Sequence, residues 1–209
     1  MDRLAEPFAN PETSREEIFR ATYRALADHG YADLSIQHIA DRTSLSKSTI
    51  YHHFDGKDDL LMAFTERMLE RYVEAFLAGP EGDPLGTLDR SLDLVLVGET
   101  ADGVPIEEVQ TAELARVVLE LRAQAVRDPR VQDYFDATDR MIRDHIEALL
   151  SAAVEEGSLR DVDAERVAAV LYVILEGALV LRTTGRDAEW LRHVRAMVDD
   201  YLAGLKRES

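Results

Sequence analysis

The chain has 209 residues, which is long enough to bury a sizeable core. Its composition, 46% hydrophobic and 31% charged, is that of a globular protein and argues against a long disordered tail. It has no cysteine, which excludes disulfides, thiolate metal sites and a cysteine nucleophile. Its net charge of −17 argues against indiscriminate attraction to the phosphates of nucleic acids.

Hydrophobic residues recur at intervals of three and four along the whole chain, and strand-like alternation is nearly absent. The sequence therefore predicts an all-α fold of about nine helices, separated by glycine and proline clusters. In chain order, the expected helices are Ser14 to Asp28, Ile36 to Arg42, Lys47 to His53, Lys57 to Leu77, Pro84 to Val97, Ile106 to Arg127, Pro129 to Glu156, Asp163 to Arg182 and Asp187 to Lys206.

Local signals place several helix ends. Gly30 is a suitable stop for the first helix because glycine is free to adopt a left-handed conformation. Asp128 before Pro129 indicates an N-cap followed by proline in the first helical position. The helix from Lys57 to Leu77 carries an apolar residue at every fourth position and is expected to connect a small N-terminal unit to the rest.

Residues 34–54 form the most informative stretch, because two short helices with hydroxyl N-caps lie four residues apart. Ser35 and Ser46 can each accept a backbone N–H of the next turn, which fixes where each helix begins. The apolar residues of the stretch are expected to face one small core; they are Ile36, Ile39, Ala40, Leu45, Ile50 and Phe54. The residues left on the outside are Lys47, Ser48, Thr49, Tyr51 and His52.

This pattern indicates a helix-turn-helix, in which the second helix enters the major groove of DNA. Small hydroxyl groups allow a close approach to bases and phosphates, whereas Lys47 and Lys57 neutralise phosphates. The local charge suits this use: between Arg42 and Lys57 three basic residues face only Asp55. The acidity lies mostly elsewhere, since residues 1–60 sum to −4 and residues 61–209 to −13.

The basic residues are also unusual in kind. Only Lys47, Lys57 and Lys206 are lysines among 24 basic residues, and this arginine-rich, acidic balance resembles that of proteins from salt-loving organisms. At about 1 M salt the Debye length is near 3 Å, so an acidic surface repels itself and DNA only weakly. A high-salt environment is therefore a hypothesis that reconciles the charge with DNA binding.

The same stretch resembles the TetR family of repressors. In that family a small hydroxyl residue and an Ile-Ala pair mark the first short helix, and here these are Ser35 and Ile39-Ala40. A small polar recognition helix with a Tyr-x-x-Phe ending follows, here residues 46–50 and Tyr51 to Phe54. A lysine before a leucine comes next, here Lys57 and Leu60. The match covers about the first 65 residues. One departure is Ser44, where the family usually has glycine; a left-handed serine costs on the order of 1 kcal/mol, so the turn is expected to differ slightly in shape.

The resemblance implies a helix-turn-helix DNA-binding domain over residues 1–56 and a larger helical domain for effector binding and dimerisation over residues 57–209. It implies a sequence-specific regulator, usually a repressor, that binds double-stranded operator DNA and is released by a small effector. The residues that it places on DNA are Ser35, Gln37, Ser46, Lys47, Ser48, Thr49, Tyr51, His52 and Lys57.

The last two helices carry broad apolar faces, which either close the core of one chain or form a homodimer interface. They resemble the four-helix bundle through which the family dimerises. A dimer would place two DNA-binding domains about 34 Å apart, so that they bind successive major grooves. The expected interface residues are Val170, Ile174, Gly177, Ala178, Leu181, Trp190, Val194, Met197, Val198 and Tyr201.

The resemblance also implies an effector cavity among the helices from Lys57 to Arg182, entered by a small and often apolar molecule. Each candidate lining residue is more often ordinary packing or a solvated position than a ligand contact. The candidates are Phe76, Leu119, Arg122, Tyr134, Met141, His145, Tyr172 and Glu176.

Other function classes fit less well. Ser151 lies six residues from His145 on one helix and points elsewhere, and no phosphate-binding glycine loop or metal motif is present, so an enzyme, a metal and a cofactor are not expected. A helical dimeric adaptor that does not bind DNA remains the alternative. The first 13 residues lack the order of a signal peptide, and the run from Val167 to Leu181 contains Glu176 and is too short for a bilayer, so a cytoplasmic protein without a membrane span is expected.

Overall fold

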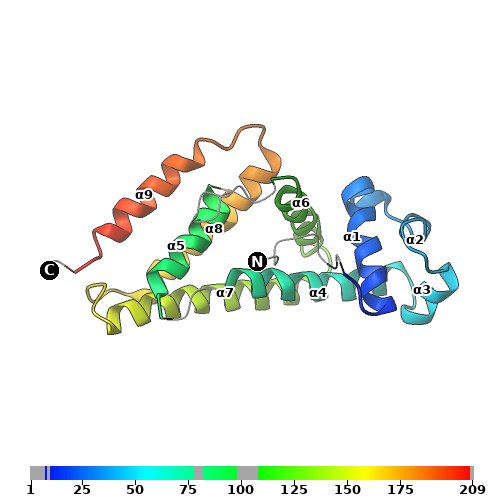
Figure 1. Cartoon of the computed structure of the whole chain (residues 1–209), viewed down its shortest axis with the longest axis horizontal. Coiled ribbons are helices and arrows are strands. Elements are labelled where there is room, and N and C mark those ends of the chain that lie inside the picture. Colours follow the sequence, from blue (N-terminus) through cyan, green and yellow to red (C-terminus); the bar gives the residue numbers. More distant parts are fainter. Residues whose placement is uncertain (1–7, 9, 78–81, 98–107, 208–209) are drawn as a thin grey trace. The chain divides into compact units, whose positions relative to one another are not determined.

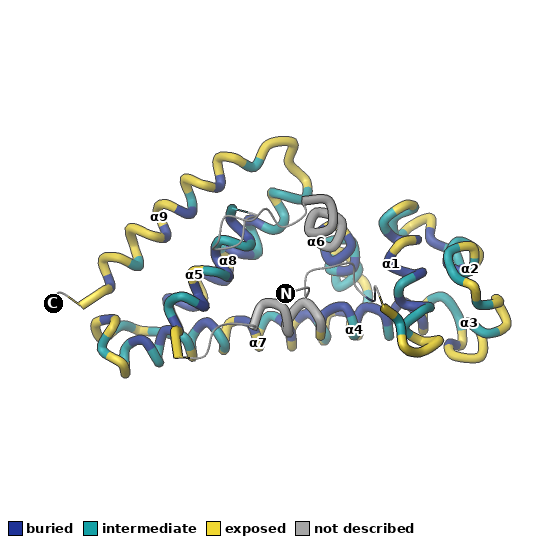
Figure 2. Tube along the Cα trace, viewed as in Figure 1, coloured by how far each residue is buried: buried dark blue, intermediate teal, exposed yellow. Residues whose placement is uncertain are grey.

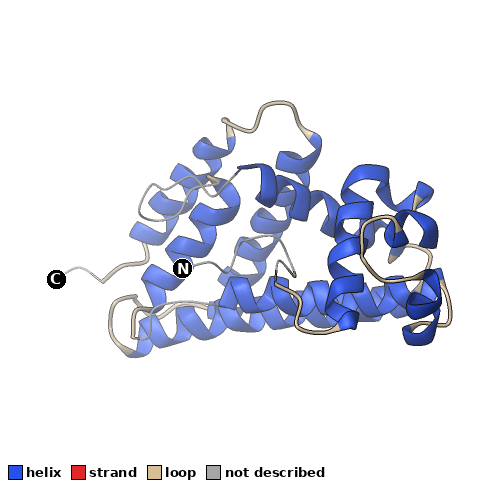
Figure 3. Ribbon diagram, turned by 45° about the vertical axis from the view of Figure 1, so that its right-hand side comes forward, coloured by secondary structure: helices blue, strands red, loops and turns tan. Residues whose placement is uncertain are grey.

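The computed structural model describes residue 8 and residues 10–77, 82–97 and 108–207, with the backbone alone for residues 71–77 and 108–114. Within these residues the chain forms helices and no strand (Figure 3). The helices in Figure 1 are α1 (Ser14–Asp33), α2 (Ile36–Ala40), α3 (Lys47–His53), α4 (Lys57–Leu77), α5 (Pro84–Leu96), α6 (Glu108–Gln124), α7 (Pro129–Glu155), α8 (Ala164–Thr184) and α9 (Leu191–Ala203). The all-α prediction is confirmed.

The bounds of α3 and α4 agree with those expected, whereas those of α9 do not. The Asp187 carboxylate accepts the backbone N–H of Glu189 at 2.9 Å, so it caps a separate turn. Helix α9 starts four residues later, after Trp190, which makes no side-chain capping bond. The predicted beginning of α6 at Ile106 lies outside the described residues.

Helix α1 extends past its expected end but is kinked at Gly30, where φ is +70°. The positive φ is a conformation that glycine adopts without a Cβ clash. Next to the kink, the Glu120 carboxylate of α6 accepts the backbone N–H of Tyr31 at 2.7 Å. This bond satisfies a donor that the kink would otherwise leave without a helical partner.

The chain divides into two compact units. The first unit comprises Met1–Tyr72 and Val109–Ala137, and the second comprises Val73–Glu108 and Thr138–Ser209. The domain boundary expected between residues 56 and 57 stays a prediction.

The first unit is built around a cluster of aromatic rings. Phe19 of α1 lies 5.9 Å from Phe54 and 6.0 Å from Phe64 of α4, measured between ring centroids. Phe8 adds a fourth ring at 5.5 Å from Phe19. Because Phe54 directly follows α3, this cluster anchors the end of that short helix to α1 and α4.

In the second unit a buried arginine joins two helices. Arg195 of α9, 7% exposed, donates to Asp93 of α5 at 2.7 Å and also bonds Asp89 of α5 and Asp199 of α9. A buried guanidinium needs such partners, because an unpaired buried charge is strongly unfavourable. The cluster therefore fixes α9 against α5.

Helix α8 is long and apolar enough, by length and composition, to cross a membrane, and it is the only such helix among the described residues. It runs three residues beyond each end of the apolar segment from Val167 to Leu181 that the sequence shows. One third of its apolar window is buried within the structure. Core helices of globular proteins pass the same test of length and composition.

Candidate nucleic-acid interface

Two serine caps set the starts of α2 and α3. Ser35 Oγ accepts the backbone N–H of His38 at 3.2 Å, and Ser46 Oγ accepts that of Thr49 at 3.1 Å. Ser46 Oγ also lies 2.9 Å from Thr49 Oγ1. Both N-caps expected from the sequence are thus confirmed, and each satisfies a donor that a helix leaves free in its first turn.

The inward side of this hairpin is fully buried. Ile39 of α2 and Ile50 of α3 have no exposed surface, and Phe54 is 3% exposed. They belong to one core with Ile18 and Phe64. The burial of Ile50 from the middle of α3 fixes the rotation of this helix about its axis, because side chains three and four positions apart share a helix face.

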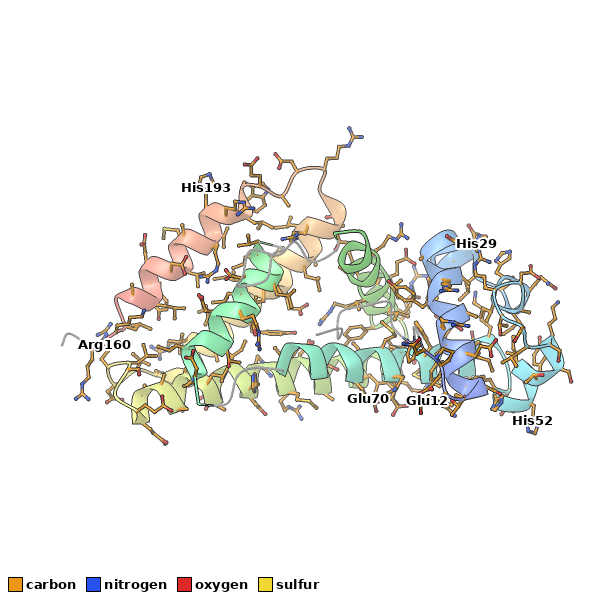
Figure 4. The ribbon with its side chains drawn as sticks, viewed as in Figure 1. Glu12, His29, His52, Glu70, Arg160 and His193 are labelled. Carbon is orange, nitrogen blue, oxygen red and sulfur yellow. The ribbon has the colours of Figure 1, made fainter. Side chains whose placement is uncertain are left out.

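The opposite side of α3 is open. Lys47, Ser48, Tyr51 and His52 are exposed, with Tyr51 at 55%, and Figure 2 shows the helix as largely exposed. His52, labelled in Figure 4, projects outward. Thr49 is half-buried because its hydroxyl lies against the Ser46 cap. The outward set expected from the sequence is therefore found, with Thr49 as its least accessible member.

The turn between α2 and α3 is held by a carboxylate of α1. Glu17 Oε1 accepts hydrogen bonds from Thr43 Oγ1 at 2.7 Å, from Ser44 Oγ at 2.8 Å and from Ser44 N at 3.1 Å. These hydrogen bonds lower the pKa of Glu17, against a smaller opposing effect of burial. Ser44 does not adopt the left-handed conformation, since Phe8 is the only described residue other than glycine with positive φ. The turn thus avoids the cost expected for serine.

Arg42 ties α2 to the end of α1. Its guanidinium bonds the Asp28 carboxylate at 2.6 Å, the His38 carbonyl at 2.9 Å and His29 Nε2 at 3.0 Å. Arginine only donates, so His29 Nε2 is the acceptor in this bond. The His29 and His38 rings stack with centroids 4.1 Å apart.

Three further candidates lie at the starts of the neighbouring helices, Ser35 and Gln37 at α2 and Lys57 at α4. Ser35 is half-buried and engaged as a cap. Gln37 is exposed, and its amide donates to Asp41 Oδ1 at 2.5 Å. Lys57 is half-buried, with its ammonium 5.7 Å from the centroid of the Tyr31 ring. A contact from Gln37 or Lys57 to DNA therefore requires the side chain to leave an internal partner.

The sequence reasoning missed the residues that hold the hairpin in place. Glu17 lies 27 residues from Ser44, and Asp28 lies 14 residues from Arg42. No local pattern reveals such pairs. The only local signal for Glu17 is that a charged residue lies at the edge of the buried stripe formed by Ile18 and Ala21.

The effector candidates fall in both units. In the first unit, Arg122 lies 4.6 Å above the Phe135 ring, and burial followed by the nearby Glu66 carboxylate raises the pKa of Tyr134. In the second unit, burial lowers the pKa of His145. Leu119 and Glu176 are half-buried, Tyr172 is buried and Met141 is 49% exposed. The side chain of Phe76 lies outside the described residues.

The dimer candidates separate into exposed and buried groups. The exposed ones are Val170, Leu181, Trp190, Met197 and Tyr201, with Met197 at 69%. Ile174 and Val194 are half-buried, and a Cβ on Gly177 would meet no atom within 4 Å. Ala178 and Val198 are buried within their own chain, at 2% and 4%. Val173, which was not a candidate, is 69% exposed.

Comparison with known proteins identifies relatives over both parts of the chain. Residues 18–64 match the family described as bacterial regulatory proteins, tetR family, and residues 104–207 match the C-terminal part of BetI-type transcriptional repressors. The crystal structure of a TetR transcription regulator from Haloarcula marismortui is 35% identical with a TM-score of 0.77, over 92% of this chain and 98% of its own.

More distant relatives show the same extent of similarity. The transcriptional repressor AcnR of Corynebacterium glutamicum is 25% identical over 90% of this chain and 92% of its own length. A transcriptional regulator from Saccharomonospora viridis, solved in complex with choline, shares the fold at 22% identity and a TM-score of 0.70, over 93% of this chain and 98% of its own.

Proposed function

Because the chain belongs to the TetR family of transcriptional regulators, we propose that it is a homodimeric repressor that binds its operator through α3 and is released by a small effector. Regulators of this family bind operator DNA and act as dimers with small-molecule effectors. For this chain we propose which residues bind DNA, form the dimer and contact the effector. We also propose that it acts in the cytoplasm, where its operator DNA lies.

The observation that carries the proposal is the two-sided character of α3. Ile50 is completely buried while Lys47, Ser48 and Tyr51 on the other side are exposed. Such a helix is held rigidly by its core and still offers short polar side chains to a groove. We assign base contacts to Ser48 and Thr49, and phosphate contacts to Lys47, Tyr51, His52 and the more distant Lys57. Ser35, Ser46 and Gln37 are assigned to the phosphate backbone beside them.

The exposed apolar side chains of α8 and α9 support dimerisation. Val170, Leu181, Met197 and Tyr201 lie in the second unit, and each leaves a large share of its surface open. On each helix the spacing of these residues places them on one face, and exposed apolar residues grouped on a helix face typically mark an interaction surface. The open space at Gly177 allows a second backbone to approach α8 closely. A two-fold dimer through these helices, with Ile174, Trp190 and Val194 at its edges, would bring two copies of α3 together for one operator.

A small effector would release the operator by favouring one conformation of the repressor over another. A differential affinity of about 1 to 3 kcal/mol between two conformations suffices to release DNA. The candidate residues in the two units supply aromatic, basic and acidic groups. Choline and apolar aromatic compounds are suitable first probes.

Selection of bound DNA from a random pool, followed by a mobility shift in 0.1 to 1 M KCl, tests the proposal. We expect one enriched, two-fold symmetric sequence and a shift at nanomolar protein, as for specific sites in general. If no sequence is enriched at any salt concentration, the chain is instead a helical adaptor.

A further inference from the structure

A cavity of about 180 Å³ lies within the first unit, and none of the residues that line it belongs to α3. It is bordered by the end of α1, the first turns of α4, the end of α6 and the start of α7. Leu61 and Leu121 form its buried apolar wall. The volume is below the roughly 300 to 1,000 Å³ of pockets for drug-sized ligands, so only a compact molecule fits.

The polar side of the cavity has an excess of negative charge. Asp58, Asp128 and Arg130 line it. The Arg130 guanidinium bonds the Asp128 carboxylate at 3.0 Å, and its charge also attracts the carboxylates of Asp58 and Asp59 without a hydrogen bond to them. No hydrogen bond or ion pair joins the Asp58 carboxylate to another described side chain. The next residue, Asp59, is occupied differently, since it accepts the backbone N–H of Asp55. Asp58 is therefore the available counter-ion.

The neighbouring polar groups are hydrogen-bond acceptors. The Gln124 amide N–H donates to the Glu120 carbonyl at 3.2 Å, which leaves the Gln124 carbonyl oxygen for a donor. Tyr31 also lines the cavity, and no hydrogen bond joins its hydroxyl to another described residue. Burial, Asp58 and Asp128 together raise the pKa of Tyr31, so its hydroxyl stays protonated and its oxygen can still accept a bond.

We propose that this cavity binds a small organic cation with N–H donors, an alkylammonium or a short diamine, and that Asp58 is its counter-ion. The ammonium would donate to Asp58, to the Gln124 carbonyl and to the Tyr31 hydroxyl, while its alkyl part lies on Leu61 and Leu121. The Lys57 ammonium already lies 5.7 Å from the centroid of the Tyr31 ring, so the ligand is proposed to contact the hydroxyl of Tyr31 and not the face of its ring. Two carboxylates and one guanidinium line the cavity, and this excess of negative charge disfavours an anion.

A ligand in this cavity would lie close to a residue that we assign to DNA. Lys57, which we assign to phosphate, shares the Tyr31 ring with the cavity. Binding itself does not rest on the proposed function, and it is measured without DNA.

Isothermal calorimetry of the full chain with n-butylammonium and with 1,4-diaminobutane, in 0.3 M KCl, tests the proposal. The salt suppresses diffuse attraction to the acidic surface. We expect one site per chain, at least a tenfold loss of affinity in Asp58→Asn, and a smaller loss in Tyr31→Phe. Asp136→Asn, which removes an equal charge from an exposed position of α7, should bind as the wild type does.

The size-matched anion butyrate should not bind. Equal affinity of the amines for the wild type and Asp58→Asn, or no binding of either amine, would overturn the proposal. DNA binding by the same preparation is unaffected by that outcome, so the two proposals fail separately.

Discussion

Glu17 of α1 receives two hydrogen bonds from Ser44 in the turn between α2 and α3, one from the hydroxyl at 2.8 Å and one from the backbone N–H at 3.1 Å. The same oxygen accepts the Thr43 hydroxyl at 2.7 Å. One carboxylate thus fixes the turn that positions α3.

Replacing this carboxylate should destabilise the first unit. Glu17→Ala leaves three donors without their partner, and because the site is half-exposed water compensates in part, so we expect a loss of about 1 to 2 kcal/mol in the free energy of unfolding. Urea denaturation measures it. Glu12→Ala, at an exposed position before α1, is the control and should have little effect.

The contribution of Glu17 should depend on pH. Its folded-state pKa lies below the ordinary value of 4.5, chiefly through the hydrogen bonds of Thr43 and Ser44. The stabilisation is therefore present above about pH 4.5 and is lost as the pH falls through the folded-state pKa. The stability difference between wild type and Glu17→Gln should shrink on acidification from pH 7 to pH 3. A difference that grows on acidification would contradict this assignment.

Contacts to phosphates and to bases should respond differently to mutation. Lys47→Ala should weaken binding to all operator variants alike and reduce the slope of log K against log[salt] by about 1. Ser48→Ala should change which bases are preferred at one position of each half-site. Fluorescence anisotropy with a set of single-base operator variants separates the two effects, and the reverse pattern would show that the two roles are exchanged.

A charge on the exposed apolar face should dissociate the dimer. Val170→Glu and Met197→Glu each place a carboxylate on a side chain that is more than half exposed in the single chain, so the monomer should remain folded. Sedimentation should show the mass of one 23.5 kDa chain in place of about twice that mass, with loss of operator binding. Gln132→Glu, exposed on α7, serves as the matched charge control. An unchanged dimer in both variants would place the interface elsewhere.

The Arg195 cluster should stabilise the second unit. Arg195→Met leaves Asp89, Asp93 and Asp199 facing one another without a cation, but two of these side chains are about half exposed, so we expect a loss of about 1 to 3 kcal/mol. Thermal unfolding should show a smaller deficit in 2 M KCl, because salt screens the repulsion among the carboxylates. A deficit that does not change with salt would indicate packing as the cause.

The sequence predicts what is encoded within a few residues. The bounds of α3 follow from the Ser46 cap and the spacing of Ile50 and Phe54, and the structure agrees with them. The beginning of α9 could not be obtained in this way, because Asp187 is a good capping residue that the structure uses in another turn.

Features that join distant parts of the chain are invisible to local patterns. Glu17 and Ser44, which are hydrogen-bonded, lie 27 positions apart in the sequence. Asp58 and Gln124, which line one cavity, lie 66 positions apart. The same holds for burial: periodicity places Ala178 and Val198 on apolar faces, but only the packed helices show that they face their own core.

The position of α3 on DNA can be measured directly, because the chain has no cysteine and a single one is uniquely reactive. Ser48→Cys carrying an iron chelate should cleave the selected operator at two positions, one in each half-site, separated by about one helical turn or 34 Å. Excess unlabelled operator should abolish both cuts. Cleavage scattered along the duplex, or none despite specific binding, would contradict the claim that α3 reads the major groove.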